Sequence, residues 1–177
     1  MRVFISVDLP ENAKKEISKA IKKIKDMDLI NANFVKPENL HLTLKFLGEI
    51  SESEIEKIKE KLSSLNLKSF IAKLCGLGFF PSEKFLRVFL ISIEAKEKFS
   101  ELSEKINSLL GNRKERFESH VTLARIKSIT DKIKFLEVVK NIRIPELKFE
   151  VKETKLKKST LSPSGPIYED IEVFSLI

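Results

Sequence analysis

Two copies of one short motif constrain this chain more than any other feature of its sequence. Residues 41–44 and 120–123 both read His-x-Thr-Leu, and they contain the only two histidines among 177 residues. Each copy begins ten residues before a hydroxyl residue, Ser51 or Thr130, and each hydroxyl residue opens a helical pattern. The repeat predicts two related lobes, each with a strand that leads into a helix.

Hydrophobic spacing predicts further strands and helices around the two motifs. Apolar runs indicate strands at 3–7, 41–47, 70–74 and 85–93, and the Gly- and Pro-containing segment between the last two predicts a broad hairpin. Apolar residues at helical spacing indicate helices at about 13–24, 55–65, 99–109 and 130–140. Residues 144–177 resemble strands broken by a turn at 162–166. We therefore expect an α+β fold.

The length and composition fit one compact domain. A chain of 177 residues with 42% hydrophobic residues is long enough to bury a core, and no Gly/Ser-rich linker separates its halves. We expect a single bilobal domain over residues 1–177, with a cleft between the lobes. A monomer is the default expectation.

Several functional classes are disfavoured by the composition. No apolar stretch approaches the ~18 residues that a membrane span needs, so we expect a soluble, cytoplasmic protein. One cysteine and two histidines are too few for a disulfide or for the usual four-ligand structural zinc site, and no metal or cofactor is expected. The net charge of +7 permits a polyanionic partner such as RNA, although most basic residues alternate with glutamates along predicted helices. The absence of Gln and Trp beside abundant Lys, Glu and Ile is typical of proteins from thermophiles.

The two motifs bring together side chains suited to acid–base catalysis. Residues two apart in a strand point to the same face, so each histidine projects with its threonine while the intervening apolar residues face the core. Imidazole titrates near ~6.5, so one of His41 and His120 can accept a proton while the other donates one. Hydrolysis of a cyclic phosphodiester needs both roles, and the hydroxyls of Thr43 and Thr122 suit hydrogen bonding to phosphoryl oxygens. A lone histidine on a strand is commonly structural, but the duplicated motif favours catalysis.

Three blocks of the sequence resemble one known family. The blocks FVKPENLHLTLKFLGEI, SHVTLARI and STLSPSGPIYE are similar, in order and spacing, to those of the 2H phosphoesterases. Within that family they resemble the RNA 2′,3′-cyclic phosphodiesterases first described as 2′-5′ RNA ligases, and the resemblance spans the whole chain. It implies a two-lobed, pseudo-symmetric α+β fold in which antiparallel sheets line a central cleft and helices pack outside. It also implies hydrolysis of RNA 2′,3′-cyclic phosphate ends to 2′-phosphate ends, without a metal.

The resemblance also implies roles for individual residues. At the matching positions, His41 would donate a proton to the leaving 3′ oxygen and His120 would accept a proton from water. Thr43 and Thr122 would hydrogen-bond the phosphate. The residues themselves leave the two histidine roles exchangeable.

Two further residues join the predicted site through the resemblance. Arg125 matches a basic position that contacts phosphate or RNA in similar proteins. Arg125 is separated from His120 by an odd number of positions, however, and in a regular strand such residues point to opposite faces of the sheet. For Arg125 to reach the site, the strand must contain a bulge or end there. Tyr168 follows the predicted turn, and only the resemblance places it near the cleft as a substrate contact. Lys45 shares the parity of His41 but is expected to be solvated or ion-paired.

Three other functions are compatible with the sequence. An RNA ligase would join the same cyclic phosphate to a 5′-hydroxyl, without ATP, since no P-loop pattern is present. A phosphodiesterase of small cyclic nucleotides would act on the same reacting group. A basic RNA-binding module would use the histidines only to contact phosphate. An exposed phenylalanine beside the cleft would suit base stacking.

Overall fold

The structure is a computed structural model that describes residues 1–111, 117–163 and 165–177. Its strands are β1 (Arg2–Asp8), β2 (Ile30–Phe34), β3 (His41–Glu49), β4 (Phe70–Ser82), β5 (Phe85–Glu94), β6 (His120–Ile129), β7 (Lys148–Val151), β8 (Glu153–Ser162) and β9 (Gly165–Ser175). The helices are α1 (Glu11–Asp26), the 3₁₀ helix η1 (Pro37–Asn39), α2 (Glu52–Ser63), α3 (Lys96–Leu110) and α4 (Lys132–Asn141). Ser164, in the predicted turn at 162–166, lies outside the described residues.

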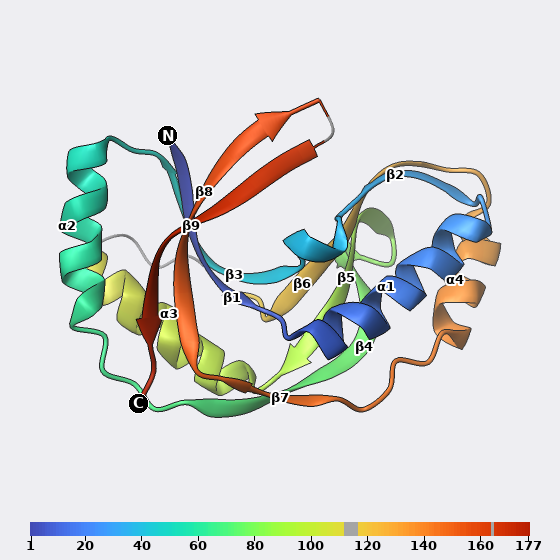
Figure 1. Cartoon of the computed structure of the whole chain (residues 1–177). Helices are drawn as coiled ribbons and strands as arrows, with labels where there is room; N and C mark the ends of the chain where they lie inside the picture. The colour runs from blue at the N-terminus through green and yellow to red at the C-terminus, as the bar shows by residue number, and fades with distance from the viewer. Residues whose placement is uncertain (112–116, 164) are drawn as a thin grey trace.

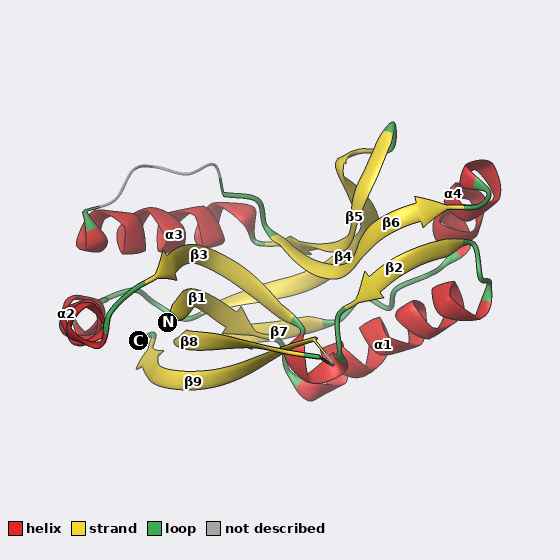
Figure 2. Ribbon diagram, turned by 90° about the horizontal axis from the view of Figure 1, so that it is seen from above, coloured by secondary structure: helices red, strands yellow, loops and turns green. Residues whose placement is uncertain are grey.

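The strands form one curled antiparallel sheet (Figure 2). Its order is β7-β4-β5-β6-β3-β1-β8-β9, and β2 pairs with β6 beside this path. The central neighbours β3 and β6 each carry one copy of the repeated motif, and they join a half made of β3, β1, β8 and β9 to a half made of β6, β5, β4 and β7. The α+β class with antiparallel strands is therefore confirmed, and the strands of the two lobes are continuous across the β3–β6 pair.

The helices flank the sheet at its two ends. Helices α2 and α3 lie at one end of the molecule, whereas α1 and α4 lie at the other (Figures 1 and 2). Helix α3 follows β5 along the chain but packs against β3 and α2, in the opposite half of the sheet. Helix α4 stays in the half of β4 and β5, where Phe135 contacts Phe79 and Phe89. None of the helices in the described ranges is long and apolar enough to cross a bilayer.

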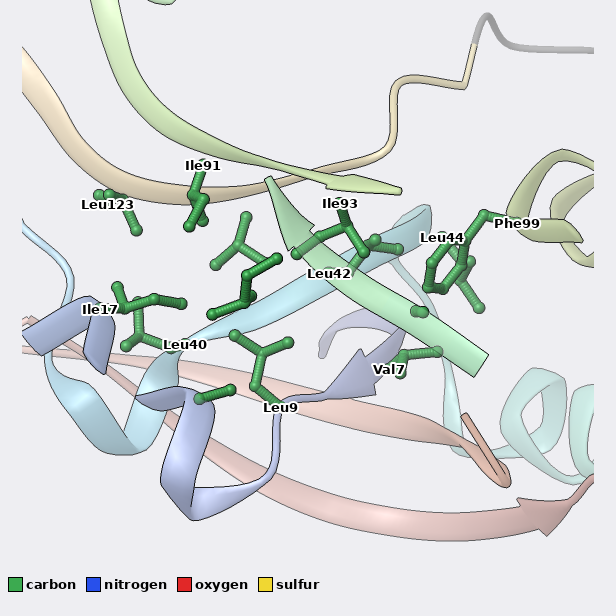
Figure 3. Packing of buried hydrophobic residues seen from close by; sticks show 14 of the residues in the cluster. Val7, Leu9, Ile17, Leu40, Leu42, Leu44, Ile91, Ile93, Phe99 and Leu123 are labelled. Atoms are coloured by element: carbon green, nitrogen blue, oxygen red, sulfur yellow. The ribbon is translucent and has the colours of Figure 1, made fainter. Parts of the chain in front are cut away.

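The apolar residues of the two motifs form the centre of the core. Leu42, Val121 and Leu123 are fully buried, and Leu44 is 5% exposed. Figure 3 shows Leu42, Leu44 and Leu123 among buried side chains of neighbouring strands and of α1. Their predicted orientation toward the core is therefore confirmed, and the histidines and threonines between them are held on a rigid apolar base.

The two helix starts after the motifs differ in detail. Ser51 forms the predicted capping box: its hydroxyl accepts the Glu54 N–H (3.3 Å), and the Glu54 carboxylate accepts the Ser51 N–H (2.8 Å). The prediction that Thr130 opens the next helix is wrong by one residue. Asp131 is the N-cap there and accepts the Lys134 N–H at 3.0 Å. Thr130 still continues the strand pairing, because its N–H donates to the carbonyl oxygen of Leu29 at 2.9 Å.

Two strand predictions need correction. The predicted hairpin is confirmed, but its first strand is longer than the expected 70–74: β4 continues to Ser82 and pairs with β5 up to a tight turn at Glu83 and Lys84. A register shift between Leu74 and Leu77 absorbs the irregular part, so Gly76 lies in a bulge, whereas Gly78 pairs regularly with Leu90. Strand β2 was not predicted, because five residues with two asparagines carry little hydrophobic signal.

Candidate active site

The two histidines begin β3 and β6, and the register between these strands brings the motifs together. Leu42 is paired with Val121 in an antiparallel arrangement. Continuing this register by one residue in each direction sets His41 opposite Thr122 and Thr43 opposite His120. Adjacent strands lie about 5 Å apart, so the four polar side chains occupy neighbouring positions on one face of the sheet.

Both strands share the same pattern of burial. In each, a half-buried histidine is followed by a buried residue, a half-buried threonine, two buried residues and an exposed one. The two copies of the motif are therefore equivalent in three dimensions as well as in sequence. This agrees with the prediction of two related lobes.

The two imidazoles are oriented by the backbone in the same way. His41 Nδ1 lies 2.7 Å from the carbonyl oxygen of Asn39, and His120 Nδ1 lies 2.9 Å from that of Glu118. Because a carbonyl oxygen only accepts, Nδ1 carries the proton in each ring, and Nε2 is left free to accept or donate a proton. His41 Nε2 lies 3.0 Å from Thr43 Oγ1, so the threonine hydroxyl donates to it when the ring is neutral.

Burial lowers the pKa of both histidines. Desolvation of the imidazolium is the largest cause in each case, and the hydrogen bond to the backbone carbonyl opposes it. The negative charge of Asp8 raises the pKa of His41, whereas Lys157 lowers it. Arg125 lowers the pKa of His120. Both rings therefore favour the neutral form in the free protein.

A β-bulge decides the position of Arg125. The register between β5 and β6 shifts beside Leu123, which becomes the extra residue of the bulged strand. The shift reverses the parity of the following residues and turns Arg125 to the face of His120 and Thr122. The charge of Arg125 lowers the pKa of His120, and at Tyr168 it opposes the larger upward effect of burial on the pKa. The bulge that the predicted role of Arg125 required is thus present.

An equivalent bulge in β3 removes Lys45 from this face. The register between β1 and β3 shifts beside Leu44, so Lys45 points to the opposite side. It is only 4% exposed, and its ammonium donates to Asn107 Oδ1 of α3 at 2.6 Å. The expectation that Lys45 shares the face of His41 and is solvated or ion-paired is therefore wrong, because the bulge lies between them.

Aromatic side chains surround His41. Tyr168 of β9 meets the imidazole edge-on at 5.3 Å between ring centroids, and Phe4 of β1 lies 5.0 Å from both rings. Phe46 occupies the position in β3 that Arg125 occupies in β6, contacts Phe4 at 6.2 Å and is 62% exposed. Burial raises the pKa of Tyr168, so its phenol is un-ionised at neutral pH.

Tyr168 reaches this place through long-range contacts. Asn39, next to the first motif, donates a hydrogen bond to the carbonyl oxygen of Pro166 at 2.8 Å, which fastens the start of β9 beside His41. The structure thus brings Tyr168 together with the first histidine, where only the family resemblance had suggested it.

Charged residues behind His41 form a network that the sequence did not indicate. Lys157 donates to Asp8 (2.9 Å) and to Asp170 (2.7 Å), and Lys155 contacts the same two carboxylates at 3.1 and 2.8 Å. Lys157 is only 8% exposed. These residues come from β1, β8 and β9, so no local spacing in the sequence points to them. Across the described part of the chain, no three His, Cys, Asp or Glu side chains group closely enough to hold a metal ion.

Comparisons with known proteins agree with the two-lobed architecture. A family model described as LigT-like phosphoesterase matches residues 7–90 and again residues 91–168, so that each match contains one copy of the motif. An RNA 2′,3′-cyclic phosphodiesterase of Methanocaldococcus jannaschii is 41% identical over 180 residues, covering 97% of this chain and 99% of the relative. A protein of the same name from Methanothermobacter thermautotrophicus is 34% identical over 183 residues, covering 99% of each.

Solved structures show the same fold. A crystal structure of a Thermus thermophilus protein aligns with a TM-score of 0.79 and 32% identity, covering 99% of this chain and 97% of that one. Escherichia coli LigT in its apo form also aligns with a TM-score of 0.79, at 22% identity, over 99% of this chain and 96% of that one.

Proposed function

Because the chain belongs to the LigT-like phosphoesterase family, we propose that it hydrolyses 2′,3′-cyclic phosphate ends of RNA to 2′-phosphate ends. The proposal is carried by one observation, the antiparallel register of β3 and β6 that brings two His-x-Thr pairs to neighbouring positions. The substrate class is taken from the relatives named RNA 2′,3′-cyclic phosphodiesterase.

In the proposed mechanism the two histidines act on opposite sides of phosphorus. His120 accepts a proton from water at Nε2 while the water oxygen attacks phosphorus. The bond between phosphorus and the 3′ oxygen breaks, and His41, protonated at Nε2, donates its proton to that oxygen. The products are a 2′-phosphomonoester and a free 3′-hydroxyl, and the two rings exchange protons with solvent before the next turnover.

The threonines and Arg125 stabilise the charge that develops on the phosphoryl oxygens. Thr43 and Thr122 lie beside the opposite motif's histidine in the β3–β6 register, so their hydroxyls flank the position proposed for phosphorus. Arg125 projects from the same face and supplies a permanent positive charge. This role for Arg125 is supported by the bulge at Leu123.

Phe46 and Tyr168 are proposed to contact the nucleoside that carries the cyclic phosphate. Phe46 is an exposed aromatic ring one bulge away from Thr43, and bases stack on such rings. Tyr168 packs against His41 with its edge, which limits the movement of the imidazole and shapes the adjacent surface.

We also infer a single bilobal domain over residues 1–177. One cluster of buried residues runs through both halves of the sheet and includes residues from β1 and β3 as well as β5 and β6. A monomer is proposed as the functional state, because the pairing of β3 with β6 already brings both motifs together within one chain.

The proposal is tested by incubating the purified protein with an oligoribonucleotide that ends in a 2′,3′-cyclic phosphate, in the presence of EDTA, and locating the phosphate in the product. We expect a 2′-phosphate end. A second arm adds an RNA with a 5′-hydroxyl end, so that a joined 2′-5′ product would identify a ligase. Binding of the cyclic-phosphate RNA without any turnover would contradict the enzyme and favour a binding module.

A further inference from the structure

We propose that the sheet face beyond Arg125 binds the RNA strand that leads to the reacting end, with Phe80 and Phe85 as stacking platforms and Arg87 as a phosphate contact. This inference rests on the proposed function, and it concerns the length of RNA that the enzyme recognises. It predicts a preference for oligonucleotides over mononucleotides.

The register of four adjacent strands puts Phe80 in line with Arg125. Asn33 of β2 pairs with Arg125 of β6, Arg125 pairs with Val88 of β5, and Val88 pairs with Phe80 of β4. These cross-strand neighbours share one face of the sheet. Two strand spacings separate Arg125 from Phe80, which is a distance of about 10 Å.

The neighbouring row of residues identifies which face this is. Phe79, Phe89 and Ala124 are the next residues in the same three strands, and they are register partners of one another. Phe79 and Phe89 pack against Phe135 of α4, on the covered side of the sheet. Because adjacent residues in a strand point to opposite faces, Phe80 lies on the open side, together with Arg125.

A second bulge adds Phe85 and Arg87 to this face. The register between β4 and β5 shifts between Phe80 and Pro81, which leaves Arg87 as the extra residue of β5. Leu86 is buried at 8% exposure, so Phe85, its neighbour, points to the opposite, open side. The end of the β4–β5 hairpin, which projects from the sheet in Figure 2, therefore carries two aromatic rings and one arginine beyond Arg125.

The two rings are available for stacking. Phe80 is 52% exposed and Phe85 is 57% exposed. Within the described ranges, neither ring contacts another aromatic side chain, in contrast to Phe46, which packs on Phe4. The Lys84 ammonium lies 5.7 Å from the centroid of the Phe85 ring. Aromatic rings with an adjacent cation are the combination that single-stranded nucleic acids bind without base preference.

The charges on this face favour a polyanion. Several lysines on the helices form ion pairs one turn away, as Lys14 does with Glu11. Among the described residues, Arg87 and Arg125 form no ion pair, although both are exposed. Unpaired guanidinium groups beside exposed rings suit phosphates and bases better than an acidic or apolar protein surface.

The chemistry of the substrate fixes the direction in which the RNA strand crosses this face. A 2′,3′-cyclic phosphate is the 3′ terminus of its RNA, so the rest of the strand can leave the site only on the 5′ side. The row from Thr122 through Arg125 to Phe80 starts at the proposed phosphate position and continues away from it. It offers the preceding nucleotides the contacts that a mononucleotide cannot use.

The test compares kcat/KM for a nucleoside 2′,3′-cyclic phosphate with kcat/KM for an oligoribonucleotide that ends in the same cyclic nucleotide. We expect wild type to prefer the oligonucleotide, and the ratio of the two values to fall about 5- to 100-fold in F80A and in F85A. F80Y keeps the ring and should retain the ratio. R87A should lower the salt dependence of oligonucleotide turnover by a slope of about 0.7.

Ile71→Ala is the matched control, because Ile71 is a 59% exposed apolar residue near the other end of β4 and pairs with Glu150. It should leave the ratio unchanged.

Equal turnover of the two substrates by wild type, or equal losses on both in F80A, would overturn this inference and leave the proposed function intact. No turnover of either substrate would instead overturn the proposed function and this inference with it. A dimer that F80A dissociates, with an unchanged ratio, would show that a second copy of the chain covers this face.

Discussion

Leu42 of β3 is the register partner of Val121 of β6, and this pair joins the two halves of the sheet at their centre. Each residue is the second of a His-x-Thr-Leu motif, so the pairing relates the two motifs by a local two-fold axis. The arrangement converts an internal repeat of the sequence into a single site with one histidine from each lobe.

The pH dependence of turnover follows from the burial of both rings. The base must be neutral and the acid protonated, so kcat/KM falls below the lower pKa and above the higher pKa of the pair. Because both pKa values are lowered from 6.5, we expect a bell-shaped profile with its maximum below pH 6.5. Asp8→Asn removes a negative charge that raises the pKa of His41. The limb of the kcat/KM profile that reports this pKa should therefore move to lower pH. A maximum well above neutrality would contradict this assignment.

Loss of either threonine hydroxyl should slow the chemical step. We expect T43A and T122A to lower kcat about 10²-fold, because each removes a donor to the phosphoryl oxygens. T43A also removes the partner of His41 Nε2. The serine variants keep the hydroxyl and should recover most of the rate. Steady-state kinetics on the cyclic-phosphate RNA separates this loss in kcat from a change in KM, and a loss confined to KM would argue for binding alone.

Arg125 should contribute charge to the bound phosphate. We expect R125A to lower kcat/KM about 10- to 100-fold, and R125K to recover only part of it, since an ammonium lacks the forked geometry. Lys127, two residues further along β6 and also exposed, provides the matched control. Similar effects of R125A and K127A would mean that only general surface charge matters.

The buried Lys45 gives a prediction about stability. Asn107→Ala leaves the ammonium without its 2.6 Å partner and should lower the free energy of unfolding by about 2 kcal/mol. Replacing Lys45 by Met and Asn107 by Leu together should cost less than Asn107→Ala alone, because no charge is then left unpaired. Lys98→Ala breaks an exposed pair with Glu101 and should change stability by less than about 0.5 kcal/mol. Urea unfolding measures all three.

Much of the fold could be predicted because its signals are local. The apolar run at 3–7, the helical spacing from Ala13 to Ile24 and the capping box at Ser51 each depend on neighbours within a few residues. The end of β4 could not be predicted, since pairing with β5 makes a strand of a segment with Gly and Pro. Asp131 and Thr130 are both good N-caps, and the competition between them is decided by the backbone of the preceding strand.

The site was predictable only where the repeat marked it. His41 and His120 are identified by a shared pattern, but the bulges that turn Arg125 toward them and Lys45 away leave no trace in the residue alternation. A strand that changes face at Leu44 or Leu123 looks regular in sequence. Lys157 and the other members of its ion-pair network come from distant strands, so only the folded sheet brings them to the first histidine.

The claim that both motifs form one catalytic unit is tested most directly by H41A and H120A, singly and combined, on RNA ending in a 2′,3′-cyclic phosphate. We expect each single variant to lower kcat about 10²- to 10⁴-fold, and the double variant to lose little more, because a single step needs both groups. Circular dichroism should show that all three variants fold. A single variant that keeps nearly the wild-type rate, or a double variant whose loss is the product of the single losses, would contradict the account.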